Sequence, residues 1–258
     1  MSFLFSQSQP LQAIIIGANR GIGLGFVRHL LADSRIGTIY GTYRRPDRAQ
    51  DLLQLAQSGG DRLIPVQLDV TQEAELAQWS DRLRAQQQQL HLLINCVGVL
   101  HDGPDIQPEK SLRQIDGDRL LHYFRVNSIP SVLLAKHLMP LFRHQQPSLF
   151  ASISAKVGSI GDNYLGGWYG YRASKAALNM LMHTTAIEYA RRCPQTCVVC
   201  LHPGTTDTDL SQPFQRNVPP EKLFPVEKTV AQLMQVIETR TLDDSGQFFS
   251  WDGQPLPW

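Results

Sequence analysis

Short apolar runs alternate along this chain with longer segments in which apolar residues recur at helical spacing. The runs predict strands at residues 11–16, 37–42, 63–68, 90–95, 148–153, 196–201 and 246–250. Between them, spacing such as that of Ile22, Phe26 and Leu30 predicts amphipathic helices. Strands separated by helix-length segments are typical of a doubly wound parallel sheet with helices on both faces. We therefore expect one α/β domain over residues 1–258.

Candidate ligand-binding residues come directly after several of these strands. Gly17, Asn95, Ser154 and Pro203 each stand at or just beyond a predicted strand end. In an open parallel sheet, ligands bind outside the carboxyl ends of the strands. The motifs are therefore expected on one rim of the sheet.

One long segment departs from the alternation. Residues 211–225 are rich in proline and polar groups, and long loops of this kind commonly carry function. We expect the segment to form a substrate lid with Phe214, Leu223 and Phe224 as its apolar side chains.

Composition narrows the function classes. The 258 residues are 42% hydrophobic and 18% charged, with a net charge of +1, so nucleic acid and anionic membranes are not expected partners. No apolar run approaches the ~18–20 residues that span a bilayer. Residues 1–7 lack the charged start and long apolar segment of a secretory signal. These features predict a cytoplasmic protein.

The four cysteines predict neither a disulfide framework nor a metal site. Cys197 and Cys200 have metal-motif spacing, but they lie in a predicted strand, where residues three apart point to opposite faces. Cys96 and Cys193 do not form a second pair. All four are expected to be core thiols.

A glycine-rich segment joins the first strand to the first helix: Gly17-Ala18-Asn19-Arg20-Gly21-Ile22-Gly23. Free backbone N–H groups and the helix dipole at such a junction favour an anion, which suits the pyrophosphate of a dinucleotide. The alternative is a plain glycine-rich turn. The position of the segment at the start of an alternating chain favours the dinucleotide.

The second strand is followed by Tyr43, Arg44 and Arg45 rather than by an acidic residue. An acidic residue there binds the ribose 2′-hydroxyl of NAD, whereas an arginine accommodates the 2′-phosphate of NADP. Arg20 is expected to add a second cation to the same phosphate. The alternative is a set of ordinary surface arginines. NADP(H) is therefore the predicted cofactor.

Two polar positions allow more than one interpretation. Asp69 and Val70 follow the third strand and are expected to contact the cofactor. Asp69 is a candidate hydrogen-bond partner for the adenine, or else the N-cap of the next helix. A long helical pattern at residues 116–139 is interrupted by Pro130 and contains Asn127, where asparagine is not favoured. Asn127 therefore has a polar task or marks a distortion.

Tyr171 and Lys175 stand one helical turn apart, on the same face of a predicted helix. A nearby positive charge favours the phenolate and would tune the tyrosine as a proton donor or acceptor for an alcohol or carbonyl group. Alone, such a pair is more often a solvated helix face, so the other motifs decide its meaning.

Taken in chain order, the motifs resemble those of the short-chain dehydrogenase/reductase family. The resemblance is carried by Gly17-x-x-x-Gly21-x-Gly23, Asn95-x-x-Gly98, Asn127, Ser154, Tyr171-x-x-x-Lys175 and Pro203-Gly204. Residues 153–160 and 166–179 and the terminal Trp258 are similar to the C-factor-like carbonyl reductase branch. The resemblance implies a Rossmann-type sheet with strand order 3-2-1-4-5-6-7.

The same resemblance implies a role for each site residue. Tyr171 is expected to be the general acid of carbonyl reduction, and Lys175 to hold the nicotinamide ribose and lower the pKa of Tyr171. Asn127 is expected to bind a water in the proton relay. The remaining cofactor contacts are expected from Asn95, Gly98, Pro203, Gly204, Thr205 and Thr208.

One position departs from the family pattern. The family usually has a serine pair at the end of the fifth strand, and its second serine polarises the substrate oxygen. Here the pair is Ser154-Ala155, so we expect Ser154, or failing that Ser159, to supply the hydroxyl.

The motifs and this resemblance together predict an NADP(H)-dependent oxidoreductase acting on a small molecule. The resemblance implies that it reduces a ketone or aldehyde and that it is a homo-oligomer (dimer or tetramer). A nucleotide-binding regulatory or signalling protein of the same fold, with little turnover, is the rival that Ala155 supports. An extended-branch epimerase or dehydratase would need a longer chain with a separate substrate domain.

Overall fold

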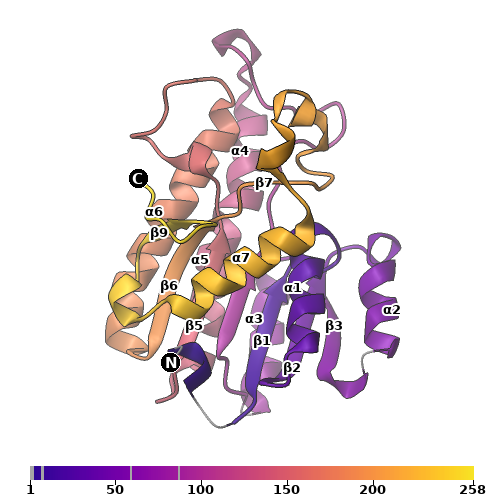
Figure 1. The fold of residues 1–258 in the computed structure, drawn as a ribbon, viewed down its shortest axis with the longest axis vertical. Coiled ribbons are helices and arrows are strands. Elements are labelled where there is room, and N and C mark those ends of the chain that lie inside the picture. Colours follow the sequence, from indigo (N-terminus) through magenta and orange to yellow (C-terminus); the bar gives the residue numbers. More distant parts are fainter. Residues whose placement is uncertain (1–2, 7–8, 59, 87) are drawn as a thin grey trace.

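A seven-stranded parallel sheet forms the centre of the molecule (Figure 1). The computed structural model describes residues 3–6, 9–58, 60–86 and 88–258, so Met1, Ser2 and Gln7 of the N-terminal stretch that was predicted not to be a secretory signal lie outside the described residues. The order β3-β2-β1-β4-β5-β6-β9 confirms the predicted topology, since β9 is the seventh strand of this sheet. Its strands are β1 (Leu11–Ile16), β2 (Ile36–Tyr43), β3 (Leu63–Gln67), β4 (Leu92–Asn95), β5 (Ser148–Ile153), β6 (Thr196–His202) and β9 (Phe248–Ser250).

Helices cover both faces of the sheet (Figure 1). They are α1 (Gly21–Ala32), α2 (Gln50–Ser58), α3 (Glu73–Ala85), α4 (Gly117–Asn127), α5 (Ile129–Leu138), α6 (Tyr169–Arg192) and α7 (Val226–Thr239). The helix expected at 116–139 is split at Ser128, because Pro130 has no N–H to continue the ladder and instead occupies the first turn of α5.

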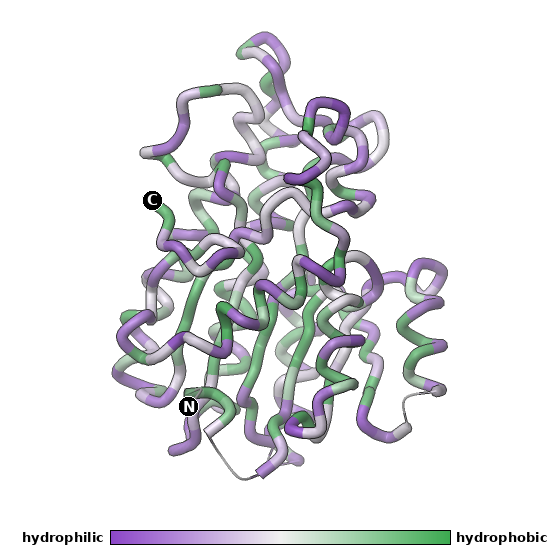
Figure 2. The backbone as a smooth tube through the Cα atoms, viewed as in Figure 1, coloured by the Kyte–Doolittle hydropathy of each residue, from purple (hydrophilic) through white to green (hydrophobic). Residues whose placement is uncertain are grey.

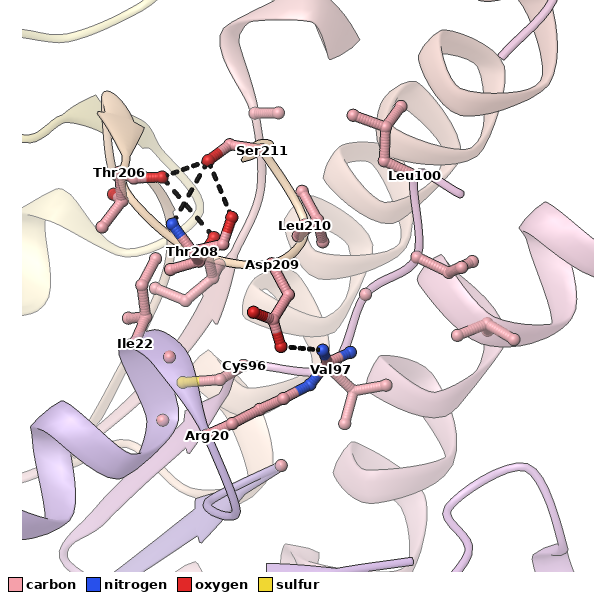
Figure 3. Close-up of a pocket in the computed structure, with 18 of the residues that line it drawn as sticks. Arg20, Ile22, Cys96, Val97, Leu100, Thr206, Thr208, Asp209, Leu210 and Ser211 are labelled. Atoms are coloured by element: carbon pink, nitrogen blue, oxygen red, sulfur yellow. Dashed lines mark hydrogen bonds and ion pairs between the residues drawn. The ribbon is translucent and has the colours of Figure 1, made fainter. Parts of the chain in front are cut away.

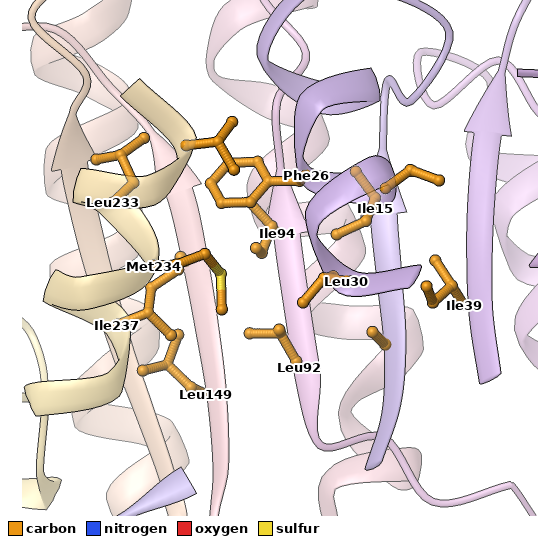
Figure 4. Close-up of a cluster of buried hydrophobic side chains, with 14 of the residues drawn as sticks. Ile15, Phe26, Leu30, Ile39, Leu92, Ile94, Leu149, Leu233, Met234 and Ile237 are labelled. Atoms are coloured by element: carbon orange, nitrogen blue, oxygen red, sulfur yellow. The ribbon is translucent and has the colours of Figure 1, made fainter. Parts of the chain in front are cut away.

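The core consists of two hydrophobic layers, one on each face of the sheet. Successive strand residues alternate between them, so Ile15 belongs to one cluster and Ile14 and Ile16 to the other. Phe26 and Leu30 of α1 and Leu233, Met234 and Ile237 of α7 cover the first face (Figure 4). Hydrophobic colour follows the central strands in Figure 2, which fits a parallel sheet buried on both faces.

The same alternation separates the two cysteines of β6. Cys197 packs in the first cluster and Cys200 in the second, as the sequence predicted for residues three apart in a strand. All four cysteines are free thiols. Within the described ranges, no group of three or more His, Cys, Asp or Glu side chains is placed to hold a metal ion.

Neither edge strand of the sheet presents a full row of free backbone hydrogen-bonding groups. At one edge, β3 contains Pro65, and the bond from Leu68 N–H to the Tyr43 carbonyl shows that even-numbered residues face β2. Because alternate residues of a parallel strand direct their N–H groups to opposite sides, the Pro65 nitrogen faces outward. At the other edge, β9 has three residues, and the tail folds back onto it, with bonds from Leu256 N–H to Phe248 O and from Ser250 N–H to Gln254 O.

The expected lid follows β6 and stands above the carboxyl ends of the strands (Figure 1). Short strands β7 (Thr205–Thr206) and β8 (Leu223–Phe224) pair in parallel and bracket it. Two 3₁₀ turns, Gln212–Asn217 and Pro220–Lys222, fill the interval. Among the described residues, no helix has both the length and the hydropathy that crossing a membrane requires.

Candidate active site

A cavity of about 720 Å³ opens at the carboxyl ends of the strands. Its wall contains all of the cofactor and catalytic residues expected from the sequence except Asn95 and Asn127, which lie behind it. The predicted rim is therefore a single continuous site, which runs from the glycine-rich loop to the first turns of α6.

The glycine-rich loop is shaped for close backbone approach. Gly17 and Gly21 have φ values of 75° and 52°, which favour glycine. A Cβ at Gly23 would collide with the Gly17 carbonyl. Helix α1 starts at Gly21, and its N-cap residue, Arg20, makes no side-chain cap, so the positive end of the helix dipole faces the cavity.

Four arginines line the far end of the cavity: Arg20, Arg44, Arg45 and Arg48. Arg20 is also paired across the cleft, its Nη1 lying 2.6 Å from Oδ2 of Asp209 (Figure 3). Sequence pattern does not indicate this partner, because the two residues are 189 positions apart. Arg48 was not predicted as a site residue, although it follows Arg44 and Arg45 closely. Its backbone carbonyl accepts from Asn19 Nδ2 at 2.9 Å.

Asp69 lines the cavity with Val70, but the N-cap interpretation is wrong. The N-cap of α3 is Gln72. The Asp69 carboxylate instead accepts from the N–H and the hydroxyl of Thr71, at 2.9 and 2.7 Å, and so closes a turn before the helix. The carboxylate is left at the cavity wall.

Asn95 and Asn127 hold the loop after β4 in place. Asn95 accepts from Val97 N–H at 3.1 Å and donates to Ser131 Oγ at 2.8 Å. Asn127 accepts from Val99 N–H at 2.7 Å, while its Nδ2 donates to Val99 O and Ser174 Oγ. Both amides therefore serve the backbone that shapes the cavity.

Gly98 is the point at which three site elements converge. The position that a Cβ would take there is 3.4 Å from Lys175 Nζ and 3.5 Å from Asn127 Oδ1. A side chain at residue 98 would thus fill the space beside both groups. This close approach explains the glycine without any requirement for positive φ.

Tyr171 and Lys175 project from α6 into the same part of the cavity, and both are buried. Lys175 Nζ donates to the Ile153 carbonyl at 3.0 Å and lies 5.9 Å from the centre of the Tyr171 ring. The helix therefore places an ammonium group beside a phenol, as the spacing of one turn predicted.

Burial dominates the proton affinities of this pair. Desolvation lowers the pKa of Lys175 to about 8 and raises the pKa of Tyr171. The expected depression of the Tyr171 pKa is therefore absent in this geometry, because burial outweighs an ammonium group that is hydrogen-bonded to a carbonyl. Tyr171 is held as a neutral proton donor.

Ser154 lies at the cavity wall with its hydroxyl turned toward α6. Its Oγ donates to Asn179 Oδ1 at 2.6 Å, and both residues are buried. Ala155 also lines the cavity and packs in the cluster that contains Tyr171. Ser159 is buried and accepts from Asp162 N–H at 3.2 Å.

The loop after β6 closes the cavity from above. Pro203, Gly204, Thr205 and Thr208 all line it. Bonds among neighbouring Thr206, Thr208 and Ser211 stiffen the loop (Figure 3). The Thr208 methyl group lies 3.3 Å from the Cβ position of Gly21, which brings this loop onto the glycine-rich loop.

His202 precedes this loop and lines the same cavity. Burial lowers the pKa of His202 to about 4, so its imidazole is neutral at pH 7.

Aromatic side chains form the wall beside Tyr171. Trp168 contacts Tyr171 and Phe214 edge-to-face, with ring centres 6.2 and 5.1 Å apart, and Phe214 contacts His101 at 5.8 Å. All four residues line the cavity. Phe224, expected in the lid wall, instead packs on Trp251 at 4.8 Å.

Comparison with known proteins gives consistent results. Residues 12–219 match the family model described as short chain dehydrogenase. An uncharacterized oxidoreductase of Schizosaccharomyces pombe is 25% identical over 95% of this chain and 96% of its own length. The C-signal protein of Myxococcus xanthus is 29% identical over 57% of this chain and 84% of its own.

A solved structure shares the fold over its whole length. The NADPH-bound carbonyl reductase from chicken fatty liver has a TM-score of 0.86 and 29% identity, covering 100% of this chain and 99% of that one.

Proposed function

Because the chain belongs to the short-chain dehydrogenase family, we propose that it is an NADP(H)-dependent reductase of ketones or aldehydes. The observation that carries the proposal is the buried Tyr171 phenol, beside Lys175, in the cavity that begins at the glycine-rich loop. The NADPH bound by the similar chicken carbonyl reductase supports the choice of cofactor.

The residues present fit this cofactor. Gly17 and Gly23 let the glycine-rich loop pack tightly at the N-terminus of α1, where free backbone N–H groups suit a pyrophosphate. Arg44, Arg45 and Arg48 offer guanidinium groups for the 2′-phosphate at the end of β2. When bound, the cofactor supplies the hydride. The remaining proposed contacts are Asn19, Arg20, Ile22, Asp69, Val70, Gly98, Pro203, Gly204, Thr205 and Thr208.

The protein's own part is orientation and proton transfer. Tyr171, neutral at pH 7, donates its phenolic proton to the oxygen of the reduced carbonyl. Lys175 stabilises the phenolate that this transfer leaves and contacts the ribose. Asn127 Oδ1 accepts from Val99 N–H and has a second lone pair, with which it accepts a hydrogen bond from a water of the proton relay. For Ser154 to polarise the substrate oxygen, its hydroxyl has to leave Asn179 Oδ1 and donate to that oxygen instead.

The test is NADPH oxidation by the purified protein against a panel of aldehydes, ketones and quinones, with Tyr171→Phe in parallel. Turnover by the wild type alone supports the proposal. Turnover by both proteins contradicts the role of Tyr171. A cytoplasmic location, a homo-oligomeric state and a lid at residues 211–225 stay predictions.

A second candidate is a nucleotide-binding regulatory protein with little turnover. It is favoured by Ala155 at the cavity wall and by the commitment of the Ser154 hydroxyl to Asn179. Tight NADPH binding without turnover on the whole panel would support this candidate.

A further inference from the structure

Trp168 stands in a backbone conformation that a bulky residue rarely adopts. Its φ and ψ are 53° and 42°, and of the described non-glycine residues it alone has positive φ. It follows Gly166 and Gly167, whose φ values are 65° and 64°. Strained residues of this kind persist where the surroundings hold them, and they cluster at functional sites.

Glu109 supplies part of that hold, together with Arg172, whose Nε donates to the Gly167 carbonyl at 3.0 Å. The Glu109 backbone carbonyl accepts from Trp168 N–H at 2.5 Å, and its Oε2 accepts from Gly170 N–H at 3.0 Å. Glu109 thus binds the residues on both sides of the start of α6. The side chain is 2% exposed, although it comes from a loop otherwise rich in exposed polar residues.

The residues packed around Glu109 leave its side chain little room to move. A Cβ at Gly170 would collide with the Tyr123 ring and with Glu109 Oε1. Tyr123 donates to the Leu100 carbonyl at 2.8 Å and contacts Tyr171 edge-to-face. Glu109 Oε1 has no hydrogen-bond partner among the described residues, so a buried carboxylate is kept here at a cost.

The consequence of this hold is the position of the indole. Trp168 fills the interval between Tyr171 and Phe214, the latter from the segment expected as a lid. Leu100, Val157 and Leu210 pack in the same cluster and line the same cavity. The substrate side of Tyr171 is therefore an apolar wall whose central surface is the indole.

We propose that Glu109 is a positioning residue that fixes Trp168 as a specificity wall, so that the site selects ring-bearing carbonyl compounds over short aliphatic ones. This proposal rests on the carbonyl reduction proposed above. Edge and face contacts with an indole favour aromatic groups beyond the area that they bury. A short aliphatic aldehyde gains little from the same wall.

Kinetics of two probe substrates, benzaldehyde and propanal, test the wall. Trp168→Ala is expected to raise the KM for benzaldehyde about three- to tenfold and to leave that for propanal within about twofold. Equal changes for both probes would overturn the wall. Asp105→Ala, an exposed acid on the same loop as Glu109, is the control and should change neither value.

Variants of Glu109 test the positioning. Glu109→Ala should reproduce the selectivity loss of Trp168→Ala, whereas Glu109→Gln, which keeps an acceptor for Gly170 N–H, should retain the selectivity. If Glu109 acts through Trp168, Glu109→Ala added to Trp168→Ala should change the KM ratio no further. A further additive change would overturn the coupling. Thermal melts identify any variant that fails to fold. If Glu109→Ala does not fold, the KM ratio of Glu109→Gln tests the positioning role instead.

A spectroscopic arm does not depend on turnover. With 5-fluorotryptophan incorporated at the four tryptophans, the ¹⁹F resonance of residue 168 is assigned by its loss in Trp168→Phe. Glu109→Ala should move that resonance toward the value of free fluorotryptophan and leave the other three in place. An unmoved resonance would refute the positioning role, even if the wild type reduces neither probe and the proposed function fails.

Discussion

Ser154 donates its hydroxyl proton to the Asn179 side chain over 2.6 Å, and both residues are buried. A serine has one O–H, so this bond removes the donor that a substrate oxygen would need. The neighbouring cavity-lining position is Ala155, which has none. In the proposed reaction, no serine hydroxyl at this strand end is free to polarise the substrate oxygen, so we expect Tyr171 to be its main hydrogen-bond donor.

Ala155→Ser should increase turnover. The new hydroxyl would stand at the cavity wall, in the cluster that contains Tyr171. Since loss of one such donor costs about 10²–10³ in turnover, even an imperfect one is expected to raise kcat about tenfold. Steady-state kinetics measure the gain, with Ser159→Thr, away from the cavity wall, as control. A decrease would show that Ser154 already serves this purpose.

Tyr171→Phe should lower kcat by about 10²–10⁴ because it removes the proton donor. NADPH affinity, measured by fluorescence titration, should change little, since the ring and its edge contacts with Trp168 and Tyr123 are kept. Tyr169→Phe, two residues earlier and partly exposed, is the matched control. Reduction by the Tyr171 variant at the wild-type rate would contradict the proposed mechanism.

Arg44→Asp should shift cofactor preference from NADPH toward NADH. The carboxylate would repel a 2′-phosphate and accept from a 2′-hydroxyl, so the ratio of the two Kd values is expected to change at least about tenfold. Arg191→Asp, an exposed arginine at the end of α6, is the control for net charge. An unchanged ratio would remove Arg44 from the phosphate site.

Asp209→Asn should tighten NADPH binding. The variant frees Arg20 from its ion pair, and because both partners are exposed, the effect is small. We expect the Kd for NADPH to fall about two- to fivefold at low ionic strength, with no change for NADH. Isothermal titration in low and high salt measures it. A weaker affinity for NADPH would mean that the ion pair helps to close the bound site.

Lys175→Met should alter the pH dependence of stability. Burial lowers the pKa of Lys175 to about 8 from 10.5, so the unfolded chain binds the proton more tightly. The lysine's contribution to stability therefore rises with pH between these values and is most unfavourable below about pH 8. In urea unfolding, the free energy of unfolding of the variant minus that of the wild type should fall by about 2–3 kcal/mol between about pH 7 and pH 10.5. A constant difference would contradict the burial effect.

Much of the fold could be predicted because its strands are short, mostly apolar runs separated by segments of helix length. The order of the sheet followed from the family resemblance and is confirmed. Helix α2 was not predicted, since Gln50–Ser58 is mostly polar and Leu52 is its one buried residue. Local pattern also placed the break near Pro130, where the missing N–H is a local property.

The contacts of the site residues were harder to predict because they depend on distant partners. Asn127 stood out as an unusual helix residue, but its bonds to Val99 and Ser174 span 28 and 47 positions. The long-range pair of Arg20 with Asp209 and the burial of Glu109 have no local signature either. Spacing places residues on a face, whereas packing decides what they bond.

The two edge strands of the sheet limit how copies of this chain can associate. The outward-facing Pro65 nitrogen interrupts the row of donors on β3, and the folded-back tail occupies β9. Neither edge offers the uninterrupted backbone ladder that strand addition requires. Growth of the sheet from one molecule into the next is thereby disfavoured, which leaves side chains on the helices and loops as the surfaces for any association between folded copies.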